Sequence, residues 1–371
     1  MPAPSADRSA AAARRDRLRA ALGAAHPGVD ALLVTDLVNV RYLSGFTGSN
    51  GALLVWADAA RGDRISTDGR YTVQVGEQAG DLPLVLARDV AGGLLAAATE
   101  AGGKRIGFEA DAMSVGEFDR LAAVGGTELV RTSGMVEALR EVKDHGEVDA
   151  IASACAVADR GLATILADGV IAPGRTERDV ARTLEWAMYA AGAAAIAFET
   201  IVATGPNSAV PHHRPTDAVL RRGDLVKIDF GAVVDGYHSD MTRTFVLGAA
   251  QDWQREIYDV VADAAQAGRD AARAGARASD VDGAARRVIA AAGYGDNFVH
   301  GLGHGVGLQI HEAPSVGATA AGTLLDGAVV TVEPGVYLPG RGGVRIEDTV
   351  VVSDGPCRIL TATDRTFTVL D

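Results

Sequence analysis

The segment Val299–Ser315 reads VHGLGHGVGLQIHEAPS, and it places three of the chain's eight histidines within twelve residues. His300, His304 and His311 are interleaved with four glycines. Glycine has no Cβ, so a glycine-rich backbone can adopt dihedrals that other residues rarely take and can approach a ligand closely. The composition of this segment therefore predicts a loop that brings histidines into a functional site.

The bulk properties of the chain fit a globular protein of two domains that does not bind nucleic acid. Its 371 residues are enough for two hydrophobic cores, and its 48% hydrophobic content is ordinary. A formal net charge of −13 opposes binding to a polyanion. The widely separated Cys155 and Cys357 form neither a disulfide framework nor a zinc motif, which fits a reducing compartment.

The N-terminal segment MPAPSADRSAAAARRDRLRAALGAA contains alanine and arginine but lacks the apolar core of a signal peptide. Asp7 and Asp16 oppose an organelle transit peptide, because such peptides are poor in acidic residues. No apolar segment elsewhere is expected to reach the ~20 residues that span a bilayer. The sequence therefore predicts a cytoplasmic protein with no membrane partner.

Two domains are predicted from the change in sequence texture near Leu139. Before it, short apolar runs alternate with turn residues, as in a compact α/β domain. After it comes a charged stretch and then a long helical pattern, so we place the boundary between domains 1–142 and 143–371. In the first domain we expect strands in 31–35, 51–57, 83–87 and 105–109, and helices near 89–101 and 114–123.

The second domain contains an internal pseudo-repeat. Segments 145–247 and 252–352 share the order helix, helix, strand, strand, without evident sequence identity. Capping-box patterns mark two of the helix starts, one at Thr176–Asp179 and one that ends at Asp282. Each strand pair carries two acidic residues, so each half of the repeat offers two carboxylates.

The hairpin DLVKIDFGAVVDGYHSDMTRTFVL (224–247) orients the carboxylates of the first half. Asp235-Gly236 is a favoured two-residue hairpin turn, and with this turn Asp229 faces Thr242 across the strands. Cross-strand partners share a face, as do residues two apart. Asp229, Asp240 and Thr242 therefore project from one side of the sheet, unless a one-residue bulge shifts the register.

The carboxylates of the second half are Glu333, in VVTVEPG, and Glu347, in VRIED. Pro334 should end the strand that carries Glu333, because proline cannot donate to a strand ladder. An unpaired buried carboxylate is unfavourable, so four acidic residues inside apolar strands need partners. The alternatives are ion pairs with nearby bases or bound cations, the bases being Lys227, Arg243 and Arg345.

We favour two divalent cations, because local ion pairs would have to recur four times across both halves of the repeat. Mn²⁺, Co²⁺ and Zn²⁺ all accept carboxylates together with an imidazole. Four carboxylates also neutralise two such ions and leave a bridging water ready to ionise. His304 is the expected fifth ligand because glycines surround it, which leaves His300, His311 and one of the pair His212/His213 for the substrate.

Five motifs in order, PHH, IDFGAVVDGYHSDMTRTF, HGLGHGVGLQIHE, VEPGVY and VRIEDTVVV, resemble those of the proline-directed metallopeptidases aminopeptidase P and prolidase. The resemblance covers residues from about 145 to the end of the chain. NVRYLSGFTGSNGALLV, in the N-terminal region, resembles the creatinase-like accessory domain of the same family. The resemblance implies an α+β fold: a C-terminal pita-bread domain with a pseudo-two-fold repeat, preceded by a smaller α/β domain.

The resemblance also implies roles for individual residues. Asp240 and Glu347 would bridge the two metal ions, and Thr242 would support the metal site. Glu333 would be both a ligand and the group that moves a proton to the leaving proline nitrogen. The five ligands would be Asp229, Asp240, His304, Glu333 and Glu347, and the residues that act on the substrate would be His212, His300, His311 and Arg345.

The activity that we expect is that of a manganese-dependent aminopeptidase, which uses a metal-bridging hydroxide to release the first residue from Xaa-Pro peptides. A prolidase, limited to dipeptides, is the alternative, and a non-catalytic binding protein on the same fold is a remote one. A methionine aminopeptidase would not usually carry the N-terminal domain, and creatinase lacks the metal ligands. The expected partners are small peptides with proline at the second position and further copies of the chain, as a homodimer or homotetramer.

Overall fold

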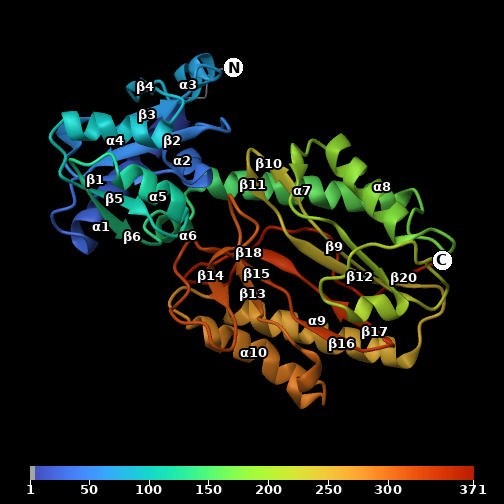
Figure 1. The fold of residues 1–371 in the computed structure, drawn as a ribbon. Coiled ribbons are helices and arrows are strands. Elements are labelled where there is room, and N and C mark those ends of the chain that lie inside the picture. Colours follow the sequence, from blue (N-terminus) through green and yellow to red (C-terminus); the bar gives the residue numbers. More distant parts are fainter. Residues whose placement is uncertain (1–4) are drawn as a thin grey trace. The chain divides into compact units, whose positions relative to one another are not determined.

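The computed structural model describes residues 5–371, with side chains from residue 8. It divides the chain into two compact units, Met1–Arg140 and Glu141–Asp371, coloured from blue to teal and from green to red in Figure 1. The split falls after residue 140, whereas the sequence places the boundary after residue 142. Each unit has its own hydrophobic core.

The first unit is a six-stranded mixed sheet in the order β4-β3-β2-β1-β5-β6. β1 pairs antiparallel with β2 and parallel with β5, and its four residues are all buried. The strands are β1 (Ala31–Val34), β2 (Gly51–Trp56), β3 (Arg64–Thr67), β4 (Leu84–Leu86), β5 (Arg105–Glu109) and β6 (Glu128–Thr132). The helices are α1 (Ser5–Ala25), α2 (Leu37–Ser44), α3 (Thr72–Gln78), α4 (Val90–Glu100), α5 (Val115–Ala122) and α6 (Glu137–Glu141), with a 3₁₀ turn η1 (Ala59–Arg61).

The strands predicted in this unit are confirmed as β1, β2, β4 and β5, and the two predicted helices as α4 and α5. The sequence did not predict α1, because polar contacts hold much of that helix in place. Arg15 is 5% exposed and forms ion pairs with Asp63 and Asp81. Such partners are far away in the sequence and leave no local pattern.

Glu109, at the end of β5, is a buried carboxyl group that anchors the start of α2. Its Oε2 accepts hydrogen bonds from the backbone N–H groups of Thr35 and Asp36, at 2.6 and 2.9 Å. Its Oε1 accepts one from Nδ2 of Asn39 at 2.7 Å. Burial outweighs these bonds and raises the pKa of Glu109 from its ordinary 4.5 to about 7.

Stability should therefore fall as pH rises between about 4.5 and 7, since the folded state then binds more protons at Glu109 than the unfolded state does. The protonated Glu109 thus adds roughly 3 kcal/mol to the free energy of unfolding at low pH, and this pH-dependent contribution should disappear in Glu109→Gln. Thermal unfolding of both proteins across this pH range measures the difference. The matched control is Glu128→Gln, at an exposed position in β6. If Glu109→Gln has the same pH profile as the unmodified protein, the raised pKa is wrong.

The second unit contains four sheets and four long helices. α7 (His145–Ala167) and α8 (Glu177–Ala190) run along one side of its strands, and α9 (Asp252–Ala271) and α10 (Ala278–Ala291) along the other (Figure 1). The strands of the first half are β7 (Ala195–Ile196), β8 (Ile201–Thr204), β9 (Leu225–Phe230), β10 (Ala232–Val234), β11 (Tyr237–His238) and β12 (Met241–Leu247), with η2 at Gly205–Ala209. Those of the second half are β13 (Gly303–Gly305), β14 (Glu312–Val316), β15 (Val329–Val332), β16 (Gly335–Leu338), β17 (Gly342–Arg345), β18 (Asp348–Val351), β19 (Arg358–Ile359) and β20 (Thr368–Leu370), with η3 at Gly295–Asn297.

The predicted pseudo-repeat corresponds to two hydrophobic clusters. One cluster joins α7 and α8 to β8, β9 and β12 through residues such as Leu162, Leu184 and Ile228. The other joins α9 and α10 to β15 and β18 through residues such as Val261, Ile289 and Val350. Each half therefore has its own packed helix pair, and the strands that carry the acidic residues lie against these helices.

The predicted hairpin register is confirmed. Asp235 and Gly236 have φ values of 48° and 74°, as a two-residue turn with left-handed backbone requires. Thr242 is the cross-strand partner of Asp229, and no bulge interrupts β9 and β12. β15 ends at Val332, so the prediction that Pro334 limits this strand is also confirmed.

The start of α10 differs from the prediction. The N-cap residue is Arg277, and it makes no side-chain capping hydrogen bond. Asp282, which was expected to complete a capping box, instead forms an ion pair with Arg286 and accepts a hydrogen bond from the backbone N–H of Leu302. This carboxylate therefore holds the chain just before His304, a role that local spacing does not reveal. At α8 the expected bond is present, from Asp179 N–H to Thr176 Oγ1 at 3.1 Å.

Among the residues that the structure describes, α7 is long and apolar enough to cross a membrane by length and composition, which the sequence analysis did not expect. In its most apolar 18-residue window, 44% is buried within the fold. Its buried positions include Ile151, Cys155, Ala158 and Leu162, which recur with helical periodicity. The core helix of a globular protein has the same pattern, so composition alone does not distinguish a core helix from a membrane span here.

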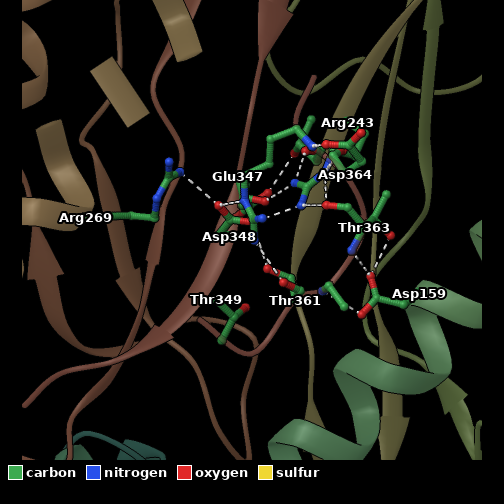
Figure 2. Close-up of polar contacts among 12 residues, drawn as sticks. Asp159, Arg243, Arg269, Glu347, Asp348, Thr349, Thr361, Thr363 and Asp364 are labelled. Carbon is green, nitrogen blue, oxygen red and sulfur yellow. Dashed lines mark hydrogen bonds and ion pairs between the residues drawn. The ribbon is translucent and has the colours of Figure 1, made fainter. Parts of the chain in front are cut away.

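Asp348, at the start of β18, connects several parts of the second unit (Figure 2). It is fully buried, and its carboxylate forms ion pairs with Arg243 of β12 and Arg269 of α9, both at 2.9 Å, and with Arg365 of the C-terminal segment at 2.6 Å. Burial alone would raise the pKa of Asp348, but the three guanidinium groups hold it below its usual value. The two halves of the repeat are thus fastened together directly beside Glu347.

Candidate metal centre

The five predicted ligands come together in one cavity of about 350 Å³, which His212 and His311 also line. Asp229 lies in β9 and His304 in β13. The other three occupy short links, because Asp240 precedes β12, Glu333 follows β15 and Glu347 lies between β17 and β18. Strand ends from both halves of the repeat therefore supply the acidic groups, as the sequence predicted.

The ligand atoms of Asp240, His304 and Glu347 all lie within 4.8 Å of one another. Nε2 of His304 is 3.6 Å from Asp240 Oδ2 and 3.6 Å from Glu333 Oε1. The other ring nitrogen, Nδ1, lies 3.0 Å from the carbonyl oxygen of Gly305 and donates to it. That bond fixes the tautomer and directs the lone pair of Nε2 towards the carboxylates, as in many metal-binding histidines.

Charge within the cluster indicates that cations belong there. Burial, and then the neighbouring carboxylates, raise the pKa values of Asp240 and Glu347 well above their usual range. Burial raises the pKa of Glu333 to about 8. Burial also lowers the pKa of His304 to about 4, so its imidazole is neutral at pH 7 and able to bind a metal. The protein alone thus offers this cluster too little positive charge to keep all its acids ionised.

The donor set fits divalent metal ions. Oδ1 of Asp229 is buried and has no hydrogen-bond partner among the described residues, as expected of an atom that faces a ligand. Of the three bases considered as alternative partners, only Arg345 forms ion pairs with the acidic cluster. Arg243 pairs with Asp348, and Lys227 donates to backbone carbonyl groups. Four carboxylates and one neutral imidazole match the preferences of Mn²⁺, Co²⁺ or Zn²⁺.

Arg345 and Thr242 hold the carboxylates of Asp229 and Glu347 in place. Arg345 is 2% exposed, forms an ion pair with Asp229, and its Nε donates to Thr242 Oγ1 at 3.0 Å. Thr242 Oγ1 in turn donates to Glu347 Oε2 at 2.7 Å. Arg345 was expected beside the substrate, but it is not among the residues that line the cavity.

His300 is likewise not among the residues that line the cavity. It is linked to Arg345 through Tyr337. The Tyr337 hydroxyl lies 2.8 Å from His300 Nε2 and accepts a hydrogen bond from Arg345 Nη1 at 2.9 Å. Burial lowers the pKa of His300 to about 4, so the neutral ring can accept from the hydroxyl. Tyr337 was not singled out in the sequence, although it is the last residue of the motif VEPGVY.

The structure distinguishes between the two adjacent histidines. His213 Nε2 lies 2.8 Å from Oε2 of Glu177, a fully buried carboxylate at the start of α8. His212 is exposed at the cavity. On the other side of the loop, the buried Lys227 donates to the carbonyl groups of Val210 and Pro211, at 2.6 and 3.1 Å. Glu177 and Lys227 thus position the loop that carries His212, and sequence spacing did not identify either role.

Two protein-family models match the chain: "Metallopeptidase family M24" over residues 149–354 and "Creatinase/Prolidase N-terminal domain" over residues 14–142. The chain belongs to metallopeptidase family M24. It is therefore a hydrolase that depends on divalent metal ions. The predicted M24 architecture, a pita-bread domain preceded by a creatinase-like domain, is confirmed.

Similar M24 proteins include several named for activity on Xaa-Pro peptides. The "Xaa-Pro dipeptidase" of Pyrococcus furiosus is 43% identical over 238 residues, which cover 64% of this chain and 68% of the relative. The solved "Xaa-Pro dipeptidase" from Bacillus anthracis is 36% identical and has a TM-score of 0.92 over 97% of this chain and all of the other. An X-Pro aminopeptidase from Thermotoga maritima is 34% identical, with a TM-score of 0.87 over 96% and 99% of the two chains.

Metal content can be tested without reference to activity. Glu347→Gln keeps the size of the side chain but removes a charge, and we expect affinity for Mn²⁺ to fall by about 100-fold or more. Titration calorimetry of metal-stripped protein and elemental analysis after dialysis measure this loss. Glu199→Gln is the matched control, because Glu199 lines the same cavity without belonging to the cluster. Equal metal binding by both variants would contradict the assignment.

Proposed function

We propose that this M24 enzyme is an Xaa-Pro dipeptidase. The sequence favoured an aminopeptidase over the dipeptidase alternative, but relatives and solved neighbours named Xaa-Pro dipeptidase or prolidase favour the dipeptidase. The observation that carries the proposal is the cavity in which the five predicted metal ligands meet two further histidines, His212 and His311. The substrates would be small peptides with proline as the second residue.

Two divalent ions, Mn²⁺ by preference, would be held by Asp229, Asp240, His304, Glu333 and Glu347. When bound, such ions activate water as a nucleophile and polarise the scissile carbonyl. The described residues fit this group because the ligand atoms converge while Arg345, Thr242 and the Gly305 carbonyl orient them. An Xaa-Pro bond has no N–H and has a fixed proline φ, so its recognition depends on the pocket rather than on that donor.

The side chains around the cluster would supply the remaining steps. His212, on its anchored loop, would donate a hydrogen bond to the oxyanion that forms during attack. Glu333 would carry a proton from the attacking water to the proline nitrogen. His311, whose ring centroid is 4.4 Å from that of His304, would contact the substrate beside the metal centre. His300 and Arg345 do not line the cavity, so they would act indirectly, by holding the Tyr337 hydroxyl in place through their hydrogen bonds to it.

The wider setting of the enzyme is also a proposal. Residues 1–142 would form the accessory domain and residues 143–371 the catalytic domain. The protein would work in the cytoplasm as a homodimer or homotetramer. Nucleic acid would not be a partner, given the net charge of −13.

The test is hydrolysis of Ala-Pro and Ala-Pro-Ala by metal-stripped protein, with and without added Mn²⁺. We expect Mn²⁺ to restore cleavage of Ala-Pro, with kcat/KM for the tripeptide lower by about 10-fold or more, because burying an unmatched chain extension costs more than ~1.4 kcal/mol. Comparable cleavage of the tripeptide at its first bond would instead identify an aminopeptidase. Cleavage of neither peptide by protein that binds two ions would reject Xaa-Pro specificity.

A further inference from the structure

We propose that Arg214 binds the C-terminal carboxylate of the substrate and thereby selects peptides that end at proline. This inference rests on the proposed dipeptidase function and adds a specificity-determining residue to it. Arg214 follows His212 by two residues and lines the same cavity. It was not among the site residues predicted from the sequence.

The charge of the cavity supports this role. Arg214 is the one lysine or arginine among the described residues that line it. The other charged groups of the lining are acidic: Glu199, Asp229, Asp240, Glu333 and Glu347. A dipeptide brings a carboxylate into this acidic environment, and a fixed positive charge on the wall would offset the repulsion.

The other arginine near the centre, Arg345, already uses most of its donors within the protein and does not line the cavity. Arg345 uses Nε for Thr242, Nη1 for Tyr337 and the Pro211 carbonyl, and Nη2 for Asp229. It is also almost fully buried. A substrate in the cavity would therefore meet Arg214, the guanidinium that lines it, before it could reach Arg345.

The backbone around Arg214 is held on both sides, while its side chain is exposed. Lys227 binds the carbonyl groups of Val210 and Pro211, and Glu177 accepts the backbone N–H of Thr216 at 2.9 Å. The Arg214 side chain nevertheless has a relative exposure of 84%. An anchored loop that presents one exposed cationic side chain suits capture of a small anion at the cavity.

Arg214 has a carboxylate partner in this structure that a substrate could replace. Its Nε lies 3.0 Å from Oε2 of Glu199, whose side chain is itself 62% exposed. Ion pairs at such exposed positions contribute little, so exchange of one carboxylate for another is easy. A carboxylate fixed inside the cavity could accept two parallel N–H hydrogen bonds from the guanidinium, one on each oxygen, which is the stronger arrangement.

The experiment compares Ala-Pro with Ala-Pro-amide, which lacks only the negative charge, using the Mn²⁺-loaded enzyme. In Arg214→Gln, we expect kcat/KM for Ala-Pro to fall by about 10- to 100-fold, mostly through KM, since a hydrogen bond to a charged group is lost. The value for Ala-Pro-amide should change by less than about two-fold, well within the small effects usual for surface substitutions. Arg214→Lys keeps the charge and should lie between the two.

Arg178→Gln is the matched control, because Arg178 is also a partly exposed arginine paired with an exposed aspartate, Asp217, but does not line the cavity. It should leave both substrates unaffected. Equal losses on the dipeptide and its amide in Arg214→Gln, or no loss on either, would overturn the role of Arg214 while leaving the dipeptidase function intact. If the unmodified enzyme does not cleave Ala-Pro, the proposed function fails and this inference fails with it.

Discussion

The buried contact between Arg243 and the Glu347-Asp348 dipeptide is the constraint on which the rest of the catalytic unit depends. Arg243 comes from the first half of the repeat, and its Nη1 donates to the Glu347 carbonyl at 2.5 Å while Nη2 pairs with Asp348. Figure 2 shows these groups converging between strands that are far apart in the sequence. The clamp sets the position of Glu347 against Thr242, and therefore against Asp229 and Asp240.

The C-terminal segment reinforces this clamp. Arg243 also donates to the Thr363 carbonyl at 2.8 Å, and Arg365 reaches Asp348. Asp159 of α7 accepts hydrogen bonds from the N–H groups of Ala362 and Thr363, both at 2.8 Å. A segment that lies outside both halves of the repeat thus ties a helix of the first half to a strand of the second. Removing one partner from so buried a network would leave an unpaired charge.

The acidic centre and the clamp beside it use buried charge in opposite ways. Asp348 is surrounded by three permanent cations, so it stays ionised without any ligand. Asp240 and Glu347 face other carboxylates, and their charges become favourable only when cations bind. Two adjacent acidic residues therefore have different roles. Glu347 is positioned to bind metal, and Asp348 holds the two halves of the repeat together.

The sequence predicted those features that follow from local geometry. The Asp235-Gly236 turn determines the register of β9 and β12, so the shared face of Asp229 and Thr242 could be worked out from spacing. Features that depend on long-range contacts could not be predicted in this way. Neither the hydrogen bonds of Lys227 to the His212 loop nor the choice between His212 and His213 leaves a trace in sequence spacing, because the partners depend on how distant strands pack. The proposed selectivity for dipeptides would likewise depend on Arg214, whose place in the cavity leaves no trace in sequence spacing.

The most direct test of the central claim, that both halves of the repeat supply ligands to one pair of ions, is anomalous diffraction at the manganese absorption edge from crystals grown with Mn²⁺. Two anomalous peaks roughly 3.5–4 Å apart, with the carboxylates of Asp240 and Glu347 between them, are the expected result. A single peak, or peaks away from Asp229, His304 and Glu333, would contradict it.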